Sequence, residues 1–586
     1  MGTNVHPLNL GKGGKRRNPF LRWRKRGDPE GSDARGRAPD EVSRGAATSK
    51  AVLTPGQDAL PELVIGLVSP VGTSLSQVAQ AVAASLKRFG YATAIQLRVS
   101  EGFMLLPTPP WSLLPKRSAV AVAAGYGAYM EAGDELRRKL ARYDAAMLPA
   151  LLRIAQERTA IANDPTASTP LVNTCLIVDS LKTPSEIDLL RAVYGDRFLV
   201  ISAYAPRETR VDSLERLIVE SPISQAERPQ AKALAETTVA RDERGRDQDL
   251  FGQDVTNAFP RADLFVDVRY DVSKEIDRFF DLLFGSPFQT PTPMEQGMFL
   301  AHTAALRSGS LARQVGAAIT TRDGQVIALG TNETPKPGGG AYWCTDDPDL
   351  RTMRTITQHP DPSDRIRADL ILDTMLKLEA SGWRPPPSVN PVNTDWVTTA
   401  AHEFSVWQAD GAAVGKRRSL LLDASIEFYR EVHAEMLAVT DAARRGVSVS
   451  GMLLFATTFP CHLCAKNLLA SGIDQIIYLE PYPKSRVTDL YHDEIALDPP
   501  ERREGVLNLQ PFVGVAPRLY QTLFRSPNRQ SRLDWPKEAI LRLHDYDVSA
   551  AELGMEHFDV PGSINREQAV LLVLSNAFTR VTGVPI

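Results

Sequence analysis

The fold of the first half of the chain is decided by residues 62–90, which read "ELVIGLVSPVGTSLSQVAQAVAASLKRFG". The segment begins with an apolar run of the length of one β-strand, and a Ser-Pro turn ends that run. Apolar residues then recur at spacings of three and four from Leu75 to Phe89, and Gly90 stops the pattern. The stretch therefore predicts a strand, a loop and an amphipathic helix.

Two more strands are predicted further along the chain. The segment "CLIVDSLKTPSEIDLLRAVYGDRFLVISAY" holds apolar runs at 175–179 and 198–203, with a helical pattern between them. Strands that alternate with helices are typical of a parallel sheet that is covered on both faces. We therefore predict an α/β domain over residues 61–288.

The loop after the first strand has the place of a phosphate-binding loop but only part of its composition. When G-x-x-x-x-G-K-[ST] is aligned to end at Ser76, the chain has Ser69, Ser74 and Leu75 where two glycines and the lysine are expected. Gly72 and Ser76 still suit such a loop, and backbone N–H groups at a helix start favour an anion. Asp179 is predicted to end its apolar strand, where a metal-positioning carboxylate would lie. The hypothesised weak nucleotide site consists of Gly72, Ser74, Ser76 and Asp179.

Arg207 and Arg210 follow the next predicted strand, where a kinase lid would carry its arginines. Two alternatives to nucleotide binding stay open for this region. One is active phosphoryl transfer, and the other is a purely structural remnant of a phosphate-binding fold.

The composition of the chain excludes several classes of protein. Residues 1–50 hold twelve Lys and Arg against five Asp and Glu, whereas the whole chain of 586 residues has a formal net charge of −3. This N-terminal segment has few periodic apolar residues, so we predict a disordered basic tail over residues 1–60. The chain has four cysteines and no run of eighteen apolar residues. We therefore expect no disulfide scaffold, no membrane span and a cytoplasmic location.

A second domain is predicted over residues 289–525. Residues 294–308 are expected to form a helix, and the apolar runs "VGAAITT" and "VIALGTN" flank an Arg-Asp-Gly turn that is typical of a β-hairpin. A polar insertion at 345–424 interrupts the domain and holds one expected helix at 364–380. Residues 526–586 remain as a C-terminal extension.

The residues that indicate chemistry follow the insertion. We predict a helix over 425–445 that holds His433 and Glu435, and a strand-to-helix turn with Cys461 and Cys464 on one side. One imidazole and two thiolates make three ligands for zinc and leave the fourth tetrahedral position to water, as in catalytic zinc sites. A thioredoxin-type redox pair is the alternative for Cys-x-x-Cys, but it requires neither the histidine nor the glutamate. H-x-E followed by P-C-x-x-C is the pattern of zinc-dependent nucleobase deaminases.

The chain resembles the antiphage dCTP deaminases, in which a P-loop kinase-like domain precedes a deoxycytidylate deaminase domain of the cytidine deaminase superfamily. The segments "RQVGAAI", "ALGTNETPKPGG", "VHAEMLA" and "FPCHLCAKNLL" carry the resemblance in the second domain, and "YMEAGDELRRKL" and "VDSLKTPSEIDLLRAVYGDRF" carry it in the first. It spans about residues 62–525. The fold that it implies is α/β, with an N-terminal P-loop kinase-like parallel-sheet domain followed by a cytidine deaminase-like α/β/α sandwich domain.

The resemblance also implies roles for individual residues. The implied zinc ligands are His433, Cys461 and Cys464, with Glu435 as general acid and base. The implied substrate contacts are Asn332 at the sugar and Arg313, Lys336 and Lys484 at the phosphates. A surface solvating role is the alternative for the two lysines. Cys344 and His402 are candidates for a second metal site.

The implied reaction is the zinc-dependent hydrolytic deamination of dCTP, and also of dCMP, to deoxyuridine nucleotides and ammonia. The resemblance implies that it depletes dCTP during phage infection, in a homo-oligomer. A regulatory nucleotide or an inhibitory RNA is a further partner that we consider. One alternative is a deaminase of single-stranded DNA or RNA, which needs a basic, aromatic-lined channel. The other is a non-catalytic regulator that binds nucleotides or RNA and holds zinc for structure alone.

Overall fold

The computed structural model describes residues 60–162, 170–284, 286, 289–311, 313–355, 362–382, 428–480, 485–525 and 560–586. The predicted basic tail lies outside these residues, as does most of the predicted insertion. The described strands and helices all belong to one compact unit of the chain, residues 56–586. None of the described helices is long and apolar enough to cross a membrane.

The first sheet has six strands in the order β12-β5-β4-β1-β3-β2. Five of them are parallel to one another, and β12 is antiparallel to its neighbour β5. The strands are β1 (Leu63–Val68), β2 (Thr93–Arg98), β3 (Thr174–Leu181), β4 (Phe198–Tyr204), β5 (Leu264–Asp267) and β12 (Gly514–Val515). The predicted α/β class and the predicted strands 175–179 and 198–203 are confirmed.

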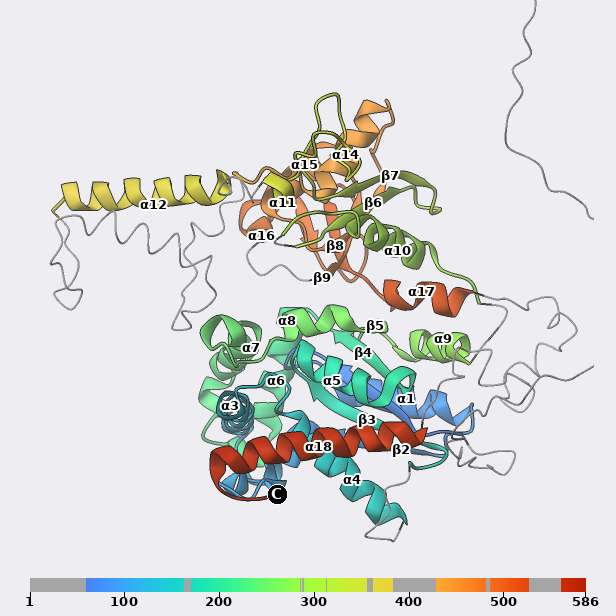
Figure 1. Cartoon of the computed structure of the whole chain (residues 1–586), viewed down its shortest axis with the longest axis vertical. Helices are drawn as coiled ribbons and strands as arrows, with labels where there is room; N and C mark the ends of the chain where they lie inside the picture. The colour runs from blue at the N-terminus through green and yellow to red at the C-terminus, as the bar shows by residue number, and fades with distance from the viewer. Residues whose placement is uncertain are drawn as a thin grey trace, which may run out of the picture. The chain divides into compact units, whose positions relative to one another are not determined.

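Helices cover both faces of the first sheet. They are α1 (Leu75–Lys87), α2 (Val99–Gly102), α3 (Val122–Leu140), α4 (Met147–Ala162), α5 (Pro184–Tyr194), α6 (Arg207–Glu220), α7 (Ala231–Gln248), α8 (Val255–Ala258), α9 (Ser273–Leu283) and α18 (Val560–Thr582). Successive side chains of a strand point to opposite faces. Leu63, Ile65 and Leu67 of β1 accordingly pack with α1 and α9, whereas Val64 and Val68 pack with α4 and α5. The long C-terminal helix α18 lies against α5 and α4 (Figure 1).

The second sheet also has six strands, in the order β10-β11-β9-β8-β6-β7. The strands are β6 (Gly316–Thr320), β7 (Val326–Thr331), β8 (Leu453–Thr458), β9 (Gln475–Glu480), β10 (Ile495–Leu497) and β11 (Leu507–Pro511). The pair β6 and β7 is antiparallel, which confirms the predicted hairpin. The pairs β8-β9, β9-β11 and β11-β10 are parallel.

The second sheet is likewise packed between helices. Its helices and those of the adjoining segments are α10 (Pro293–Ala305), α11 (Thr352–Thr355), α12 (Pro362–Ala380), α14 (Ala434–Arg444), α15 (His462–Ala470), α16 (Val487–Leu490) and α17 (Pro517–Phe524). Met298 and Ala301 of α10 join the core on one face, and Ala434 of α14 and Leu468 of α15 join the core on the other. Two predicted helices, 294–308 and 364–380, correspond to α10 and α12 within three residues at each end.

The predicted helix 425–445 is wrong at its start. Helix α14 begins at Ala434, and the described residues before it are not helical. Val432 instead forms an antiparallel bridge with Glu333, through backbone hydrogen bonds of 3.0 and 3.2 Å. A residue that pairs with a neighbouring strand segment has an extended backbone. Because of this tertiary contact, α14 begins only after His433.

Candidate functional site

His433 is the N-cap residue of α14, so its backbone is extended (φ −64°, ψ 151°) although its carbonyl accepts the first helical hydrogen bond, from Leu437 N at 2.8 Å. The position of α14 depends on a close approach to β7. A Cβ atom at Gly330 would lie 2.0 Å from the carbonyl oxygen of Ala434. Only a residue without a side chain permits that approach. The glycine of β7 thus positions the histidine at the start of α14.

Cys461 is the N-cap residue of the second helix of the site, α15, which follows β8. Its sulfur accepts a hydrogen bond from the backbone N–H of Cys464, at 3.4 Å. Cys464 lies in the first turn of the helix, so the two sulfurs face the same side, as their spacing predicts. A helix N-terminus carries a partial positive charge, which favours thiolates.

The structure brings the three predicted ligands together from two helix starts. The Nδ1 atom of His433 lies 3.3 Å from Cys461 Sγ and 3.4 Å from Cys464 Sγ. The three ligand atoms all lie within 4.8 Å of one another, and both cysteines are buried. One imidazole nitrogen and two sulfurs suit Zn²⁺, which binds such donors at about 2.0 to 2.3 Å in a tetrahedron. The arrangement is consistent with a zinc site that has one further coordination position.

The electrostatics of the cluster favour a cation. Hydrogen bonding by the Cys464 thiol, and then by His433, lowers the pKa of Cys461 to about 4. That sulfur is therefore a thiolate at neutral pH. The hydrogen bond between His433 and Cys461 in turn raises the pKa of the His433 imidazole to about 9. A bound metal cation deprotonates a coordinating thiol outright. It would therefore take the place of the hydrogen bonds among His433, Cys461 and Cys464.

Glu435 is the second residue of α14 and is almost completely buried, at 2% exposure. Burial raises the pKa of its carboxyl group above the ordinary value, and the negative charge of Cys461 adds to that effect. Glu435 thus lies buried beside the three predicted ligands, and its role as general acid and base stays a prediction.

Asn332 follows β7 directly, and both ends of its amide hold the backbone of a neighbouring loop. Its Oδ1 accepts from Val315 N and its Nδ2 donates to the carbonyl oxygen of Arg313, both at 2.7 Å. The next residue, Glu333, pairs with the residue before His433. Asn332 therefore lies close in sequence and structure to the ligand-bearing turn. The role of Asn332 at a sugar stays a prediction.

The predicted phosphate contacts differ in what surrounds them. The exposed Arg313 forms an ion pair with Glu480 at the end of β9. Lys336 forms an ion pair with Asp346. Each cation would have to exchange its carboxylate for a phosphate in order to bind substrate. Lys484 lies outside the described residues.

The predicted second metal site is not formed by the described residues. Cys344 is exposed, and His402 lies outside the described residues. Within the part of the chain that the structure describes, His433, Cys461 and Cys464 are the one group of three such residues close enough to hold an ion.

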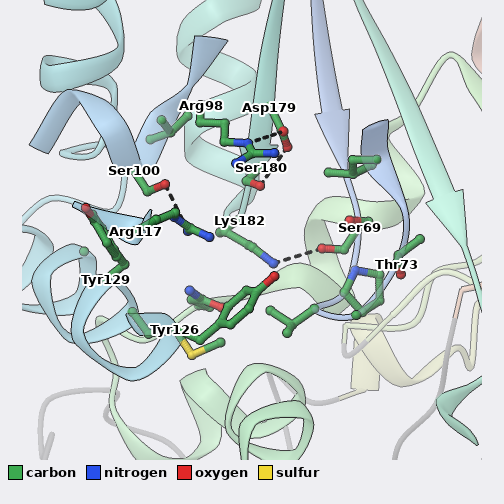
Figure 2. Close-up of a pocket in the computed structure, with 18 of the residues that line it drawn as sticks. Ser69, Thr73, Arg98, Ser100, Arg117, Tyr126, Tyr129, Asp179, Ser180 and Lys182 are labelled. Carbon is green, nitrogen blue, oxygen red and sulfur yellow. Dashed lines mark hydrogen bonds and ion pairs between the residues drawn. The ribbon is translucent and has the colours of Figure 1, made fainter. Parts of the chain in front are cut away.

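A separate cavity of about 530 Å³ lies beside the loop between β1 and α1 (Figure 2). Its lining includes all four residues of the hypothesised nucleotide site, namely Gly72, Ser74, Ser76 and Asp179. Asp179 does not end its strand as predicted, because β3 continues to Leu181. Arg207 and Arg210 do not line the cavity; both form ion pairs with Glu243.

Sequence reasoning missed the cations of this cavity. Arg98, Arg117, Lys182 and Arg216 line it together with the loop. Lys182 could have been found, because it follows the predicted strand 175–179 by three residues. Nothing local marks Arg117, which comes from the segment between β2 and α3 and reaches the cavity through tertiary packing.

Comparisons with known proteins match the second sheet and its surroundings. The family model described as "Cytidine and deoxycytidylate deaminase zinc-binding region" matches residues 291–480. The deoxycytidylate deaminases of Enterobacteria phages T2 and T4 are each 43% identical over 56 residues, which is 10% of this chain and 30% and 29% of those proteins. ComE operon protein 2 of Bacillus subtilis is 36% identical over 53 residues, 9% of this chain and 28% of that protein.

These matches are partial. The chain spans less than a third of the length of each of these relatives. The crystal structure of the dCMP deaminase from cyanophage S-TIM5 in apo form aligns over 38% of this chain and 99% of that chain, with 17% identity and a TM-score of 0.19. Residues 291–480 are thus similar to the cytidine and deoxycytidylate deaminase zinc-binding region, and His433, Cys461 and Cys464 lie within the matched residues.

Proposed function

We propose that the chain is a zinc-dependent hydrolase that deaminates deoxycytidine nucleotides, dCTP and also dCMP, to deoxyuridine nucleotides and ammonia. The observation that carries this proposal is the meeting of His433, Cys461 and Cys464 beside the buried carboxyl group of Glu435. The match of residues 291–480 to the deaminase zinc-binding region supports the same reaction. A redox function of the two cysteines would leave the histidine and the glutamate without a role.

The roles of the residues follow from their chemistry. His433, Cys461 and Cys464 would hold a zinc ion, which when bound makes water acidic enough to act as a nucleophile near neutral pH. Glu435 takes a proton from the attacking water and passes it to N3 of the cytosine ring. It then takes the second proton of that water, from the hydroxyl group now bonded to C4, and supplies it to the amino group, so that the C–N bond breaks and ammonia leaves. Burial of Glu435 keeps bulk water away from these transfers.

The substrate contacts of this site are also part of the proposal. We assign the sugar to Asn332 and the phosphates to Arg313, Lys336 and Lys484. The relatives named deoxycytidylate deaminase support a single nucleotide, not a polynucleotide, as substrate. From the resemblance of the whole chain we further propose a P-loop kinase-like first domain, a homo-oligomer, and depletion of dCTP in antiphage defence.

The test uses the purified full chain with dCTP, dCMP and single-stranded DNA as separate substrates, and it measures ammonia and uracil. We expect dCTP and dCMP to be deaminated, and the cytosines of the single-stranded DNA to remain unchanged. Glu435→Gln should lower kcat by at least about a thousandfold and keep the zinc content of the wild type. The proposal fails if Glu435→Gln retains wild-type turnover, or if neither nucleotide is deaminated by zinc-loaded protein.

A further inference from the structure

The cavity beside the loop between β1 and α1 is separate from the metal site. All of its lining residues fall between Ser69 and Gln253, so none of them belongs to the second sheet. Its volume of about 530 Å³ is that of a pocket for a small molecule. It lies at the carboxyl ends of β1 and β3, where open α/β sheets bind their ligands.

The loop between β1 and α1 offers fewer backbone N–H groups to an anion than a phosphate-binding loop does. A phosphate-binding loop points its backbone N–H groups at the ligand. Here the N–H of Val71 donates to Asp242 at 2.7 Å, that of Thr73 to Pro70 O at 3.3 Å, and that of Leu75 to Thr73 O at 3.0 Å. Three loop amides are therefore used within the protein, so we expect side chains to supply much of the binding of an anion in the cavity.

Two cations of the cavity lack a carboxylate partner among the described residues, although Arg117 donates a hydrogen bond to Ser100 Oγ at 3.1 Å. Arg117 and Arg216 have no carboxylate within ion-pair distance among the described residues. The Nε–H of the half-buried Arg117 is buried and has no hydrogen-bond partner there, and the hydroxyl of Thr73 is in the same condition. Buried polar groups are rarely left without partners, so these groups indicate a ligand.

Lys182 supplies a third positive charge next to the loop. Its ammonium group donates to the carbonyl oxygen of Ser69 at 2.9 Å and to Asp242 at 3.1 Å. It comes from the end of β3, yet it places a cation beside the loop that lacks the expected lysine. In Figure 2 the end groups of Arg117 and Lys182 point toward the same space, with Tyr126 beside them.

The same space has an aromatic wall. The rings of Tyr126 and Tyr129 lie 5.2 and 4.9 Å from the guanidinium carbon of Arg117, and Phe103 also lines the cavity. An aromatic side chain offers a flat surface on which a nucleobase can stack. We propose that this cavity binds a nucleoside triphosphate, with the phosphates at Arg117, Lys182 and Arg216 and the base at Tyr126.

We expect the bound nucleotide not to be turned over, because the two lining carboxylates among the described residues, Asp179 and Glu186, already have hydrogen-bond partners. Asp179 accepts hydrogen bonds from Gln96 and Ser180, both at 2.8 Å, and lies 3.5 Å from Arg98. Glu186, the other lining carboxylate, accepts from the backbone N–H groups of Lys182 and Thr183. Phosphoryl transfer needs a metal held by such a group. The cavity is therefore a binding site and not a kinase active site.

The test is isothermal titration of the full chain with ATP, GTP and dTTP, which lack cytosine, and with inorganic tripolyphosphate. We expect at least one nucleotide to bind with a Kd below about 1 mM and to be recovered intact in the presence of Mg²⁺. Arg117→Ala should weaken binding about tenfold or more, and so should the exposed Arg216→Ala, which puts the fold at little risk. Tyr126→Ala should weaken binding of the nucleotide and leave that of tripolyphosphate unchanged.

The control is Arg153→Ala on α4, a half-buried arginine outside the cavity, which should bind like the wild type. Circular dichroism checks the fold of each variant. The proposal is overturned if none of the three nucleotides binds below about 1 mM, or if Arg117→Ala and Arg216→Ala bind as the wild type does. It is also overturned if tripolyphosphate binds as tightly as the nucleotides, or if the nucleotide is hydrolysed. Binding is measured without deamination, so this proposal and the proposed function can fail independently.

Discussion

The phenol of Tyr204, at the end of β4 in the first sheet, donates a hydrogen bond to the carboxylate of Asp498, which follows β10 in the second sheet. The same carboxylate accepts from the phenol of Tyr478 in β9, at 2.9 Å. The ring of Tyr478 packs edge-on against Phe459, with 4.9 Å between ring centroids, and Phe459 lies two residues before the ligand Cys461. One carboxylate thus joins the two sheets close to the metal site.

We predict that Asp498→Ala lowers the free energy of unfolding by about 2 to 4 kcal/mol, because the phenols of the buried Tyr478 and the half-buried Tyr204 lose their acceptor at once. Urea unfolding followed by circular dichroism measures this change. The control is Asp493→Ala, whose side chain is 81% exposed and which should change the free energy by less than about 0.5 kcal/mol. Equal effects of the two variants would contradict the structural role of Asp498.

Removal of one predicted ligand should empty the metal site. We predict that Cys464→Ala lowers the zinc content of the purified chain at least about a hundredfold in the presence of a competing chelator, because two ligands cannot close a tetrahedral site. Atomic emission measures zinc per chain. Cys344→Ala is the matched control, since that cysteine is exposed and outside the cluster. A full zinc content in Cys464→Ala would exclude it as a ligand.

The close approach of β7 and α14 predicts that Gly330→Ala is destabilising. The added Cβ atom would lie 2.0 Å from Ala434 O and 2.6 Å from Ala438 N, so the helix has to move. We expect a loss of about 2 to 4 kcal/mol and weaker zinc retention, since His433 begins that helix. In the control Gly127→Ala, on α3, a Cβ atom meets nothing within 4 Å. That variant should be neutral or more stable by up to about 1 kcal/mol.

A buried ion-pair network joins α18 to the first sheet. Arg158 of α4 donates to Glu62 at 2.6 and 2.9 Å and to Glu567 of α18 at 2.7 Å, and all three side chains are at most 4% exposed. We predict that Arg158→Ala costs about 3 to 5 kcal/mol, because two carboxylates stay buried without their cation. Thermal unfolding and limited proteolysis of α18 measure the effect.

The control for Arg158 lies on the same helix. Arg153 forms a half-buried pair with Glu157 one helical turn away, at 2.6 Å, and such i,i+4 pairs within a helix contribute little. Arg153→Ala should therefore shift the free energy of unfolding by less than about 1 kcal/mol. If Arg158→Ala leaves α18 as resistant to proteolysis as Arg153→Ala does, the network does not hold this helix in place.

The pH dependence of stability should contain a contribution from Asp134. Burial raises the pKa of this carboxyl group from 3.8 to about 6, and Glu131 and Asp249 add to the rise, although Arg137 and Arg241 lie 3.0 and 3.5 Å away and lower it. Between these values the folded chain keeps a proton that the unfolded chain has released. The free energy of unfolding therefore falls as pH rises from about 4 to about 6, by at most about 3 kcal/mol, and this contribution is constant above that range.

Asp134→Asn tests this contribution, because asparagine does not titrate. The difference in free energy of unfolding between Asp134→Asn and the wild type should grow in favour of the variant from about pH 4 to about pH 6. Urea unfolding at a series of pH values measures the difference, and the exposed Asp493→Asn is the control. A difference that shrinks over this range would show that the ion pairs with the two arginines outweigh burial.

The sequence by itself determined the parts of this protein that depend on neighbours within about twenty residues. Apolar periodicity located β1, α1, β3 and β4, because strands and helices bury side chains at fixed spacings. The Asp-Gly turn located the β6-β7 hairpin. The spacing of Cys461 and Cys464 placed both sulfurs on one side of a helix start. Each of these features depends on residues close together in the chain, so its pattern can be recognised in the sequence alone.

Only the tertiary structure decided which segments that are distant in the sequence contact one another. His433 lies outside its helix because Val432 pairs with Glu333, a residue 99 positions earlier in the numbering. Residues 514–515 extend the first sheet although they follow the second, since β5 offers an edge with unpaired backbone groups. Arg117 and Lys182 reach one cavity from segments 65 positions apart. Such contacts depend on how whole faces pack, and a periodic pattern specifies which face is apolar but not which partner covers it.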